Sequence, residues 1–379
     1  MNISSSNKEW VNATWEKIDR KMQKVAVRSK NKIPYTTDEN GVHDNMAEKD
    51  ISWWTNGFWG GLLWLLYIDT KNEVYKATAE NVEKLMDRAL AKHSRLHHDV
   101  GFMWHILSGV NYRITGNEAS KQRNLYAASV LSSRYNIKGE YITAWNGKEH
   151  EGWTIIDCMM NIPLLYWATE ETGYERYRYV AQAHADHTMK VHIRPDGSIN
   201  HIVSHEIDSP KVIETFGGQG YCVGSCWSRG QAWALYGFVL SYVHTGKSEY
   251  LDTAKKVANY FIAACCNDWL PRVDFCAPAE PVLYDSTALC CAASGLIELS
   301  KVAHENEKAK YLDAAINMLR ACDKKFCNYD ENIDHLVEYG TEVYPVTGTE
   351  KGVHIPIIYG DYYFIESIYK LRGNEFLAW

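Results

Sequence analysis

Hydrophobic residues recur along the chain at helical spacing, in segments of two alternating kinds. Segments of the first kind are apolar on nearly all sides, as expected of helices that lie inside a protein. Three of them end in a Thr-Gly pair, at Gly116, Gly173 and Gly246, where glycine favours the end of a helix. The six segments of this kind are 57–70, 101–115, 154–172, 229–245, 286–302 and 360–371.

Segments of the second kind have one apolar stripe and a charged face, which is typical of helices at a surface. They alternate with the first kind and cover 10–28, 75–93, 119–135, 175–191, 249–266 and 309–325. The alternation predicts an all-α toroid with six inner helices inside six outer ones. Strand signals are weak, although short loops such as 191–204 and 273–285 could carry small hairpins. No Pro- or Ser-rich linker interrupts the pattern, so we expect a single domain over residues 1–379.

In such a toroid every inner helix begins at the same end, so residues near those beginnings converge on one central cavity. Acids, cations and aromatic rings are crowded at these positions, which predicts a ligand pocket there. The residues concerned are Trp53, Trp54, Asn56, His97, His98, Asp99, Trp153, Asp157, Gln219, Trp227, Arg229, Tyr284, Asp285, Tyr359 and Asp361.

Composition narrows the classes of partner. The net charge of −7 and the absence of a basic stripe argue against nucleic acid. The longest apolar stretches, 59–68 and 233–243, are too short to cross a bilayer, and the first residues lack a signal-peptide pattern. The 10 cysteines fit neither a disulfide framework nor a zinc site, so we expect a cytoplasmic protein. The 14 Trp and 25 Tyr exceed ordinary use; most should fill the core, and a few could stack on sugar rings.

Two aspartates stand out because their neighbours are apolar. Asp99 lies in LHHDVGFMW, just before the second apolar segment, and Asp157 lies in WTIIDCMMNIP, within the third. Burying an ionised carboxylate is costly unless it is paired or protonated. Asp99 could simply cap a helix, since an aspartate is a common N-cap. Asp157 lacks that explanation inside a helix, so the sequence favours a general acid at this position.

Three polar residues at other inner-helix beginnings could bind an anionic sugar. His201 lies in GSINHIVSHE, Gln219 in FGGQGY and Arg229 in CWSRGQAW. Each alone could be ordinary surface or capping chemistry, but together they would supply a cation and hydrogen-bond donors. The sequence contains no nucleophile elbow, Walker loop, HExxH motif or dinucleotide fingerprint. We therefore expect an enzyme without cofactor or metal.

Taken together, these segments resemble the unsaturated glucuronyl hydrolases of glycoside hydrolase family 88. The resemblance runs from about residue 50 to residue 366, through WWTNGFWGG, HHDVGFMW, the Asp157 segment, GGQGY, WSRGQAWALYG, DSTALCCAASGLIEL and YGDYYFIE. It implies an (α/α)6 barrel that removes a 4,5-unsaturated glucuronic acid from lyase-generated oligosaccharides. Such enzymes protonate C4 of the vinyl ether and add water at C5, and the resulting hemiketal opens.

The resemblance also implies roles for individual residues. Asp157 would be the acid and then the base towards water, and Asp99 would hold sugar hydroxyls and help to keep Asp157 protonated. Trp54 and Trp145 match positions that stack on sugar rings, and Arg229 and His201 would meet the uronate carboxylate or nearby oxygens. Further matching pocket positions are His98, Gln219 and Trp233.

One stretch departs from the family pattern. Members that prefer sulfated fragments carry Ser-x-x-Ser-x-Lys before YGDYY, whereas this chain has Val346 at the first position, Thr349 at the second and Glu350 before Lys351. Thr349 and Lys351 could still bind sulfate, but a preference for sulfated substrates is in doubt.

Three other functions remain open on the sequence. An unsaturated rhamnogalacturonyl hydrolase would share the chemistry but act on pectin fragments. A sugar epimerase on the same toroid would use His98 and His201 as acid and base, which leaves Asp157 without a role. A non-catalytic binding toroid would not need paired acids. We expect a monomer or weak homodimer whose partner is an oligosaccharide ending in an unsaturated uronic acid, with no membrane contact.

Overall fold

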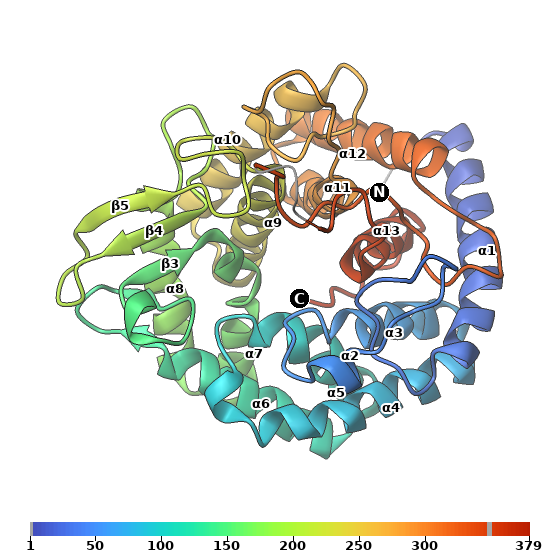
Figure 1. Ribbon diagram of the computed structural model, residues 1–379, viewed down its shortest axis with the longest axis horizontal. Coiled ribbons are helices and arrows are strands. Elements are labelled where there is room, and N and C mark those ends of the chain that lie inside the picture. Colours follow the sequence, from blue (N-terminus) through green and yellow to red (C-terminus); the bar gives the residue numbers. More distant parts are fainter. Residues whose placement is uncertain (1–2, 347–350) are drawn as a thin grey trace.

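The computed structural model describes residues 3–346 and 351–379, and its helices form a closed ring in two layers (Figure 1). Neighbouring inner helices contact each other all the way round, and α13 closes the ring against α3. The inner layer consists of α3 (Phe58–Thr70), η2 (Gly101–Gly109) with α5 (Val110–Thr115), η4 (Ile156–Met160) with α7 (Pro163–Thr172), α9 (Ser228–Thr245), α11 (Ser286–Val302) and α13 (Ile358–Leu371). This arrangement is the predicted (α/α)6 barrel.

The outer layer pairs one amphipathic helix with each inner helix. The pairs place α4 (Glu73–Leu90) on α3, α6 (Glu118–Ser133) on η2, α8 (Glu175–Val191) on α7, α10 (Ser248–Cys265) on α9, α12 (Glu305–Lys325) on α11 and α1 (Ser5–Arg28) on α13. The pair of α1 and α13 brings the first and the last helix of the sequence together. Gly116, Gly173 and Gly246 end their helices with φ of 72°, 72° and 70°, as the Thr-Gly pairs predicted.

The third apolar segment differs from the prediction. It begins as strand β3 (Trp153–Ile155), continues as the 3-10 turn η4, and becomes an α-helix only at Pro163. The prediction that Asp157 lies inside an α-helix was therefore wrong, because the aromatic and β-branched run 153–155 pairs with a neighbouring strand instead.

A small antiparallel sheet accounts for that pairing. Strand β3 pairs with β4 (Ile202–His205), which pairs with β5 (Val212–Phe216), and the sheet stands at one side of the ring (Figure 1). The expected hairpins in 191–204 and 273–285 are reduced to single bridges, Ile193 with Ile199 and Arg272 with Tyr284. A second pair of strands, β1 (Tyr135–Asn136) and β2 (Tyr141–Ile142), follows α6, and α2 (Met46–Lys49) and the short turns η1 (His93–Arg95) and η3 (Lys148–His150) complete the elements.

One hydrophobic core runs round the ring and across its middle. The side chain of Trp379 lies in this middle, stacked on Tyr363 and donating from Nε1 to Glu366 at 2.8 Å. In the described part of the chain, no helix combines the length and apolar character needed to cross a membrane.

Candidate active site

Asp99 and Asp157 lie at the same end of the ring and are joined through Asn161. Nδ2 of Asn161 donates to Oδ1 of Asp99 and to the main-chain oxygen of Asp157, both at 3.2 Å. Oδ1 of Asn161 accepts from the N–H of Phe102 at 2.8 Å. Asn161 therefore satisfies a donor at the beginning of η2, and Asp99 is not the cap of that helix. Its carboxyl group is therefore not used to cap the helix.

Two histidines surround the buried carboxyl group of Asp99. Oδ2 lies 3.3 Å from Nδ1 of His97, and Oδ1 lies 3.2 Å from Nε2 of His98. Burial lowers the pKa of His97 to about 4, and burial together with His97 lowers the pKa of His98 well below its usual range, so both rings are neutral near pH 7. The pairs are therefore contacts between a carboxyl group and neutral rings.

The same surroundings raise the pKa of Asp99. Burial raises the pKa of Asp99 well above its usual range, and the nearby charge of Asp157 raises it further. Nδ1 of His98 lies 2.6 Å from the carbonyl oxygen of Ala144 and must donate to it, which leaves a lone pair on Nε2 facing Asp99. A protonated Asp99 relieves the repulsion between these two acceptors. The surroundings of Asp99 thus favour its protonated form.

Asp157 lies beside His201 without a hydrogen bond between them. Oδ2 of Asp157 and Nε2 of His201 lie 3.5 Å apart, and neither has a hydrogen-bond partner. Nδ1 of His201 lies 3.2 Å from both the N–H of Gln219 and the carbonyl oxygen of Gly217, so the ring is fixed in place. Gly218 has φ of +58°, and a Cβ there would lie 2.3 Å from His201, which explains the glycine. Unpaired buried polar atoms of this kind indicate a place for a ligand.

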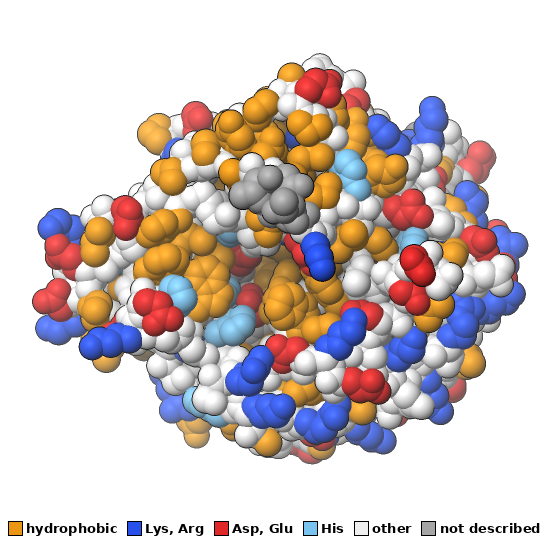
Figure 2. Space-filling model, in the orientation of Figure 1, with side chains coloured by type: hydrophobic (Ala, Val, Ile, Leu, Met, Phe, Trp, Pro, Cys, Tyr) orange, Lys and Arg blue, Asp and Glu red, His pale blue; other side chains and the backbone are white. Residues whose placement is uncertain are grey.

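Two half-buried tryptophans lie near the site. Trp54 is half-buried with its ring 5.1 Å from that of Tyr359, and Trp145 is half-buried with its ring 5.8 Å from that of His98. Figure 2 shows histidine and acidic side chains between two groups of hydrophobic side chains near the middle of this face. These two tryptophans are therefore placed where a sugar ring could stack.

Other residues expected in the pocket have structural partners. Arg229 is 1 % exposed, and its guanidinium donates to Asp285 at 2.5 Å and to the carbonyl oxygens of Thr341 and Glu342 at 2.7 Å each. The side chain of Gln219 donates to the same Glu342 carbonyl at 2.7 Å. Arg229 and Gln219 thus hold the 341–342 segment in place.

Trp233 lies behind the pocket wall. It is fully buried, and its ring packs 5.2 Å from Phe102 and 5.6 Å from Tyr363. Its place is in the core, where it supports Phe102 at the beginning of η2. Of the two residues expected to meet sulfate, Lys351 is exposed, and Thr349 lies outside the described residues.

Sequence reasoning missed two residues that support the site. Asn161 follows an apolar run, in the sequence Asn-Ile-Pro, where nothing distinguishes it from an ordinary helix-end residue. Only its hydrogen bonds to Phe102 and Asp99 show that it supports the site. Nη2 of Arg134 donates to the carbonyl oxygen of Ala144 at 3.3 Å. His98 contacts the same oxygen, so Arg134 helps to hold the acceptor of His98 in place. No local sequence signal marks either residue, since each acts on partners distant in the chain.

Among the residues that the structure describes, His97, His98 and Asp99 form a group that could hold a metal ion. Their possible ligand atoms lie within 4.8 Å of one another.

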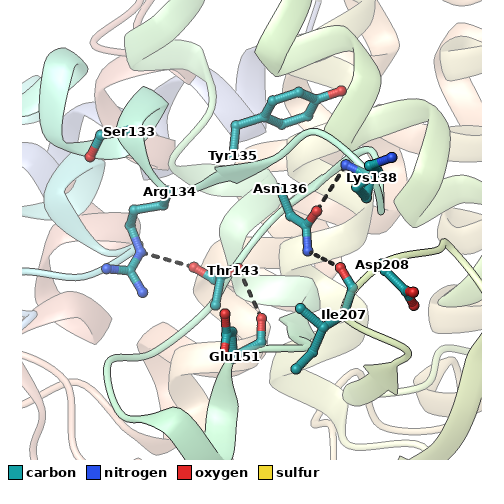
Figure 3. Close-up of a pocket in the computed structure, with 9 residues that line it drawn as sticks. All are labelled: Ser133, Arg134, Tyr135, Asn136, Lys138, Thr143, Glu151, Ile207 and Asp208. Atoms are coloured by element: carbon teal, nitrogen blue, oxygen red, sulfur yellow. Dashed lines mark hydrogen bonds between the residues drawn. The ribbon is translucent and has the colours of Figure 1, made fainter.

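A separate cavity of about 560 Å³ lies outside the ring, between Arg134, Asn136 and Ile207 (Figure 3). Asn136 Nδ2 donates to the Ile207 carbonyl at 2.9 Å, and Arg134 Nε donates to the Thr143 carbonyl at 2.9 Å. The side chains of Asn136 and Arg134 are thus engaged by the protein main chain.

A two-layered helical ring with two carboxyl groups and flanking aromatic rings at one end defines a class of sugar-hydrolysing enzymes. The family model for Glycosyl Hydrolase Family 88 matches residues 25–270, and the chain belongs to that family. It is 33% identical over 358 residues to the unsaturated glucuronyl hydrolase of Bacillus sp. (strain GL1), covering 92% of this chain and 93% of the relative.

Two further comparisons agree. The unsaturated chondroitin disaccharide hydrolase of Streptococcus pneumoniae is 32% identical over 381 residues, covering 98% of this chain and 94% of the relative. The crystal structure of the unsaturated glucuronyl hydrolase from Bacillus sp. GL1 superposes with a TM-score of 0.87 at 32% identity, covering 94% of this chain and 96% of that one. The family expected from the sequence is confirmed.

Proposed function

We propose that this enzyme releases 4,5-unsaturated glucuronic acid from the non-reducing end of oligosaccharides made by polysaccharide lyases, including those derived from glycosaminoglycans. The names of both curated relatives support this substrate. The pectin-directed alternative has no support among those names. The sugar epimerase and the non-catalytic toroid fit neither the family nor the paired carboxyl groups.

In the proposed reaction the proton donor is Asp157, whose Oδ2 has no protein partner. Burial and the charge of Asp157 raise the pKa of Asp99, which favours the protonated form of Asp99 and so limits the negative charge beside the donor. Asp157 gives its proton to C4 of the vinyl ether, and the electron pair of the double bond forms the new C–H bond. The cation left at C5 is stabilised by the ring oxygen.

Water then completes the reaction. The Asp157 carboxylate takes a proton from the water that adds at C5, which regenerates the acid. The product is a hemiketal, and its opening releases the rest of the oligosaccharide. His201, 3.5 Å from Asp157, is positioned to contact this water or the uronate carboxylate. Trp54 and Trp145 are proposed to stack on the sugar rings, and His98 to hold Asp99 in place.

The roles of Arg229, Gln219 and Trp233 are proposed to be indirect. Arg229 and Gln219 bind the 341–342 segment, and Trp233 packs behind Phe102. Thr349 and Lys351 remain candidates for contact with the leaving sugar. The observation that carries the whole proposal is the pair formed by Asp99, with its raised pKa, and Asp157, with its unpaired oxygen, which Asn161 joins.

Replacing the acid tests the proposal directly. Asp157→Asn removes the proton donor without changing size, and we expect kcat to fall at least about 100-fold. The measurement is the loss of ultraviolet absorbance of the unsaturated bond in a lyase-generated disaccharide. Asp252→Asn, at an exposed position on α10, is the matched control and should keep wild-type activity. Substantial turnover by Asp157→Asn with an unchanged circular dichroism spectrum would refute the role given to Asp157.

We also propose a cytoplasmic location and a monomer or weak homodimer. The location is supported by the ten cysteines, all of which are free thiols. Cys290 and Cys322 have their sulfur atoms 3.7 Å apart without forming a disulfide.

A further inference from the structure

A second sugar-sized surface lies beside the proposed catalytic hollow, on the sheet. The register aligns Trp153 with Ser204 and Glu214, and Ile155 with Ile202 and Phe216, so these side chains share one face. Trp153 and Phe216 are half-buried and stacked, with ring centroids 4.4 Å apart and planes at 20°. Both rings line a cavity of about 650 Å³. Half-exposed stacked rings of this kind offer a platform for the apolar face of a ligand.

This platform is continuous with the catalytic hollow. The Trp153 ring lies 6.2 Å from that of Trp145, which lies 5.8 Å from the His98 ring beside Asp99. The chain also connects them, since β3 leads from Trp153 to Asp157 in four residues, a span of at most about 13 Å. Figure 2 shows hydrophobic side chains extending from the middle of the face towards the sheet.

The charge of the cavity restricts what can bind there. One lysine, Lys148, faces five carboxylates in its wall, and burial lowers the pKa of His205, so that ring adds no positive charge near pH 7. Lys211 pairs with one of these acids, Glu206. Sulfated or carboxylated sugars would be repelled by such a wall. The five acidic residues are Glu149, Glu151, Glu206, Asp208 and Glu214.

We propose that the sheet face around Trp153, Phe216 and Glu214 is a distal subsite that binds uncharged sugars of the leaving oligosaccharide, beyond the sugar attached to the unsaturated uronate. The inference rests on the proposed function, because the catalytic hollow fixes which end of the oligosaccharide reaches the sheet. It makes substrates longer than a disaccharide, with neutral sugars at their reducing end, the preferred class. The acidic wall selects against polysulfated chains.

Phe216→Ala tests the platform. The probes are an unsaturated uronyl disaccharide and an unsaturated tetrasaccharide whose three further sugars are uncharged. We expect kcat/KM for the tetrasaccharide to fall about 3- to 10-fold, as for loss of one aromatic stacking contact, and the fall for the disaccharide to be clearly smaller. Tyr179→Ala removes an exposed aromatic ring from the outer helix α8 and should affect neither substrate.

Glu214→Lys tests the charge. It replaces one wall carboxylate by a cation, so we expect kcat/KM for a tetrasaccharide sulfated on its distal sugars to rise several-fold relative to the neutral tetrasaccharide. The ratio should return towards the wild-type value at high salt, because salt screens an exposed charge. A ratio that is unchanged by the substitution would overturn the charge selection.

The outcomes separate this inference from the proposed function. If the wild-type enzyme hydrates neither probe, the proposed function fails. If it hydrates both, and Phe216→Ala lowers both equally or neither, the distal subsite is refuted while the proposed function stands. A selective loss on the tetrasaccharide supports the subsite.

Discussion

At the scale of single residues, the raised pKa of Asp99 is the central chemical feature. Its physical origin is burial, since Asp99 is 7% exposed and lies beside a second carboxyl group and two neutral histidines. Such a carboxyl group ionises with difficulty, which is useful to an acid catalyst and costly to the fold. The conflict between catalysis and stability at Asp99 can be measured with a substitution.

Asp99→Asn should make the protein more stable but less active. In the wild type, the folded-state pKa of Asp99 lies above its value of 3.8 in the unfolded chain. Between these two values the folded protein keeps a proton that the unfolded chain releases, so wild-type stability falls as pH rises. Asparagine cannot ionise, so the stability of the variant does not fall with pH for this reason. The difference in melting temperature, variant minus wild type, should therefore be larger at pH 8 than at pH 4, while kcat falls on the order of 100-fold.

The exposed substitution Asp252→Asn serves as the control for this pH series, because its carboxylate is in solvent. Its difference from the wild type should be flat across the same range. A flat difference for Asp99→Asn as well would mean that Asp99 ionises as freely as an exposed aspartate, and the raised pKa of Asp99 would be refuted.

At the scale of elements, close approach of helices positions the catalytic segment. Helix α9 packs against η4, which carries Asp157, and the contact is made at Gly237. A Cβ at Gly237 would lie 2.5 Å from Cβ of Met159 and 2.8 Å from its main-chain carbon. Since main chain cannot yield as a flexible side chain does, the glycine sets the distance between the two elements.

Gly237→Ala should therefore displace η4 and cost stability and activity together. We expect a loss of about 1–3 kcal/mol in the free energy of unfolding, from overpacking, with a marked fall in kcat. Urea unfolding and the absorbance assay measure the two effects. A neutral result would show that the contact can relax.

Gly360 offers the matched control on another inner helix. The nearest atom to a Cβ there would be Cγ2 of Thr287, at an ordinary 3.4 Å. Gly360→Ala should be neutral or slightly stabilising, because alanine favours the helix more than glycine does.

At the scale of the whole molecule, the ring must be both closed and filled. Helix α1 packs on α13, so the first helix of the sequence covers the last. In the middle, Trp379 contacts Phe102, Tyr236 and Tyr363, which come from three different inner helices. One side chain thus touches elements that are far apart in sequence.

Trp379→Ala should destabilise the ring as a whole. Removing a fully buried tryptophan leaves a cavity, and Glu366 loses the donor at 2.8 Å, so we expect a cost of about 3–5 kcal/mol in the free energy of unfolding. Denaturant titration gives the cost, with Tyr179→Ala as a surface control. A cost below about 1 kcal/mol would show that the inner helices pack without this residue.

The sequence by itself determined the ring, because six apolar and six amphipathic segments can bury their surfaces together in few ways. It also brought Asp99 and Asp157 to one end, since inner helices begin on the same side. The single domain over 1–379 and the roles of individual site residues stay predictions.

Only the tertiary structure decided how the site is built. The run 153–155 became a strand because β4 offered it partners, and Arg229 was engaged by Asp285 and by carbonyl groups distant in sequence. The Asn161 bridge, the buried Trp233 and the half-exposed Phe216 arose in the same way. Hydrophobic period specifies which face of a segment is buried, whereas hydrogen-bond partners and close contacts depend on residues that the chain brings together only when folded.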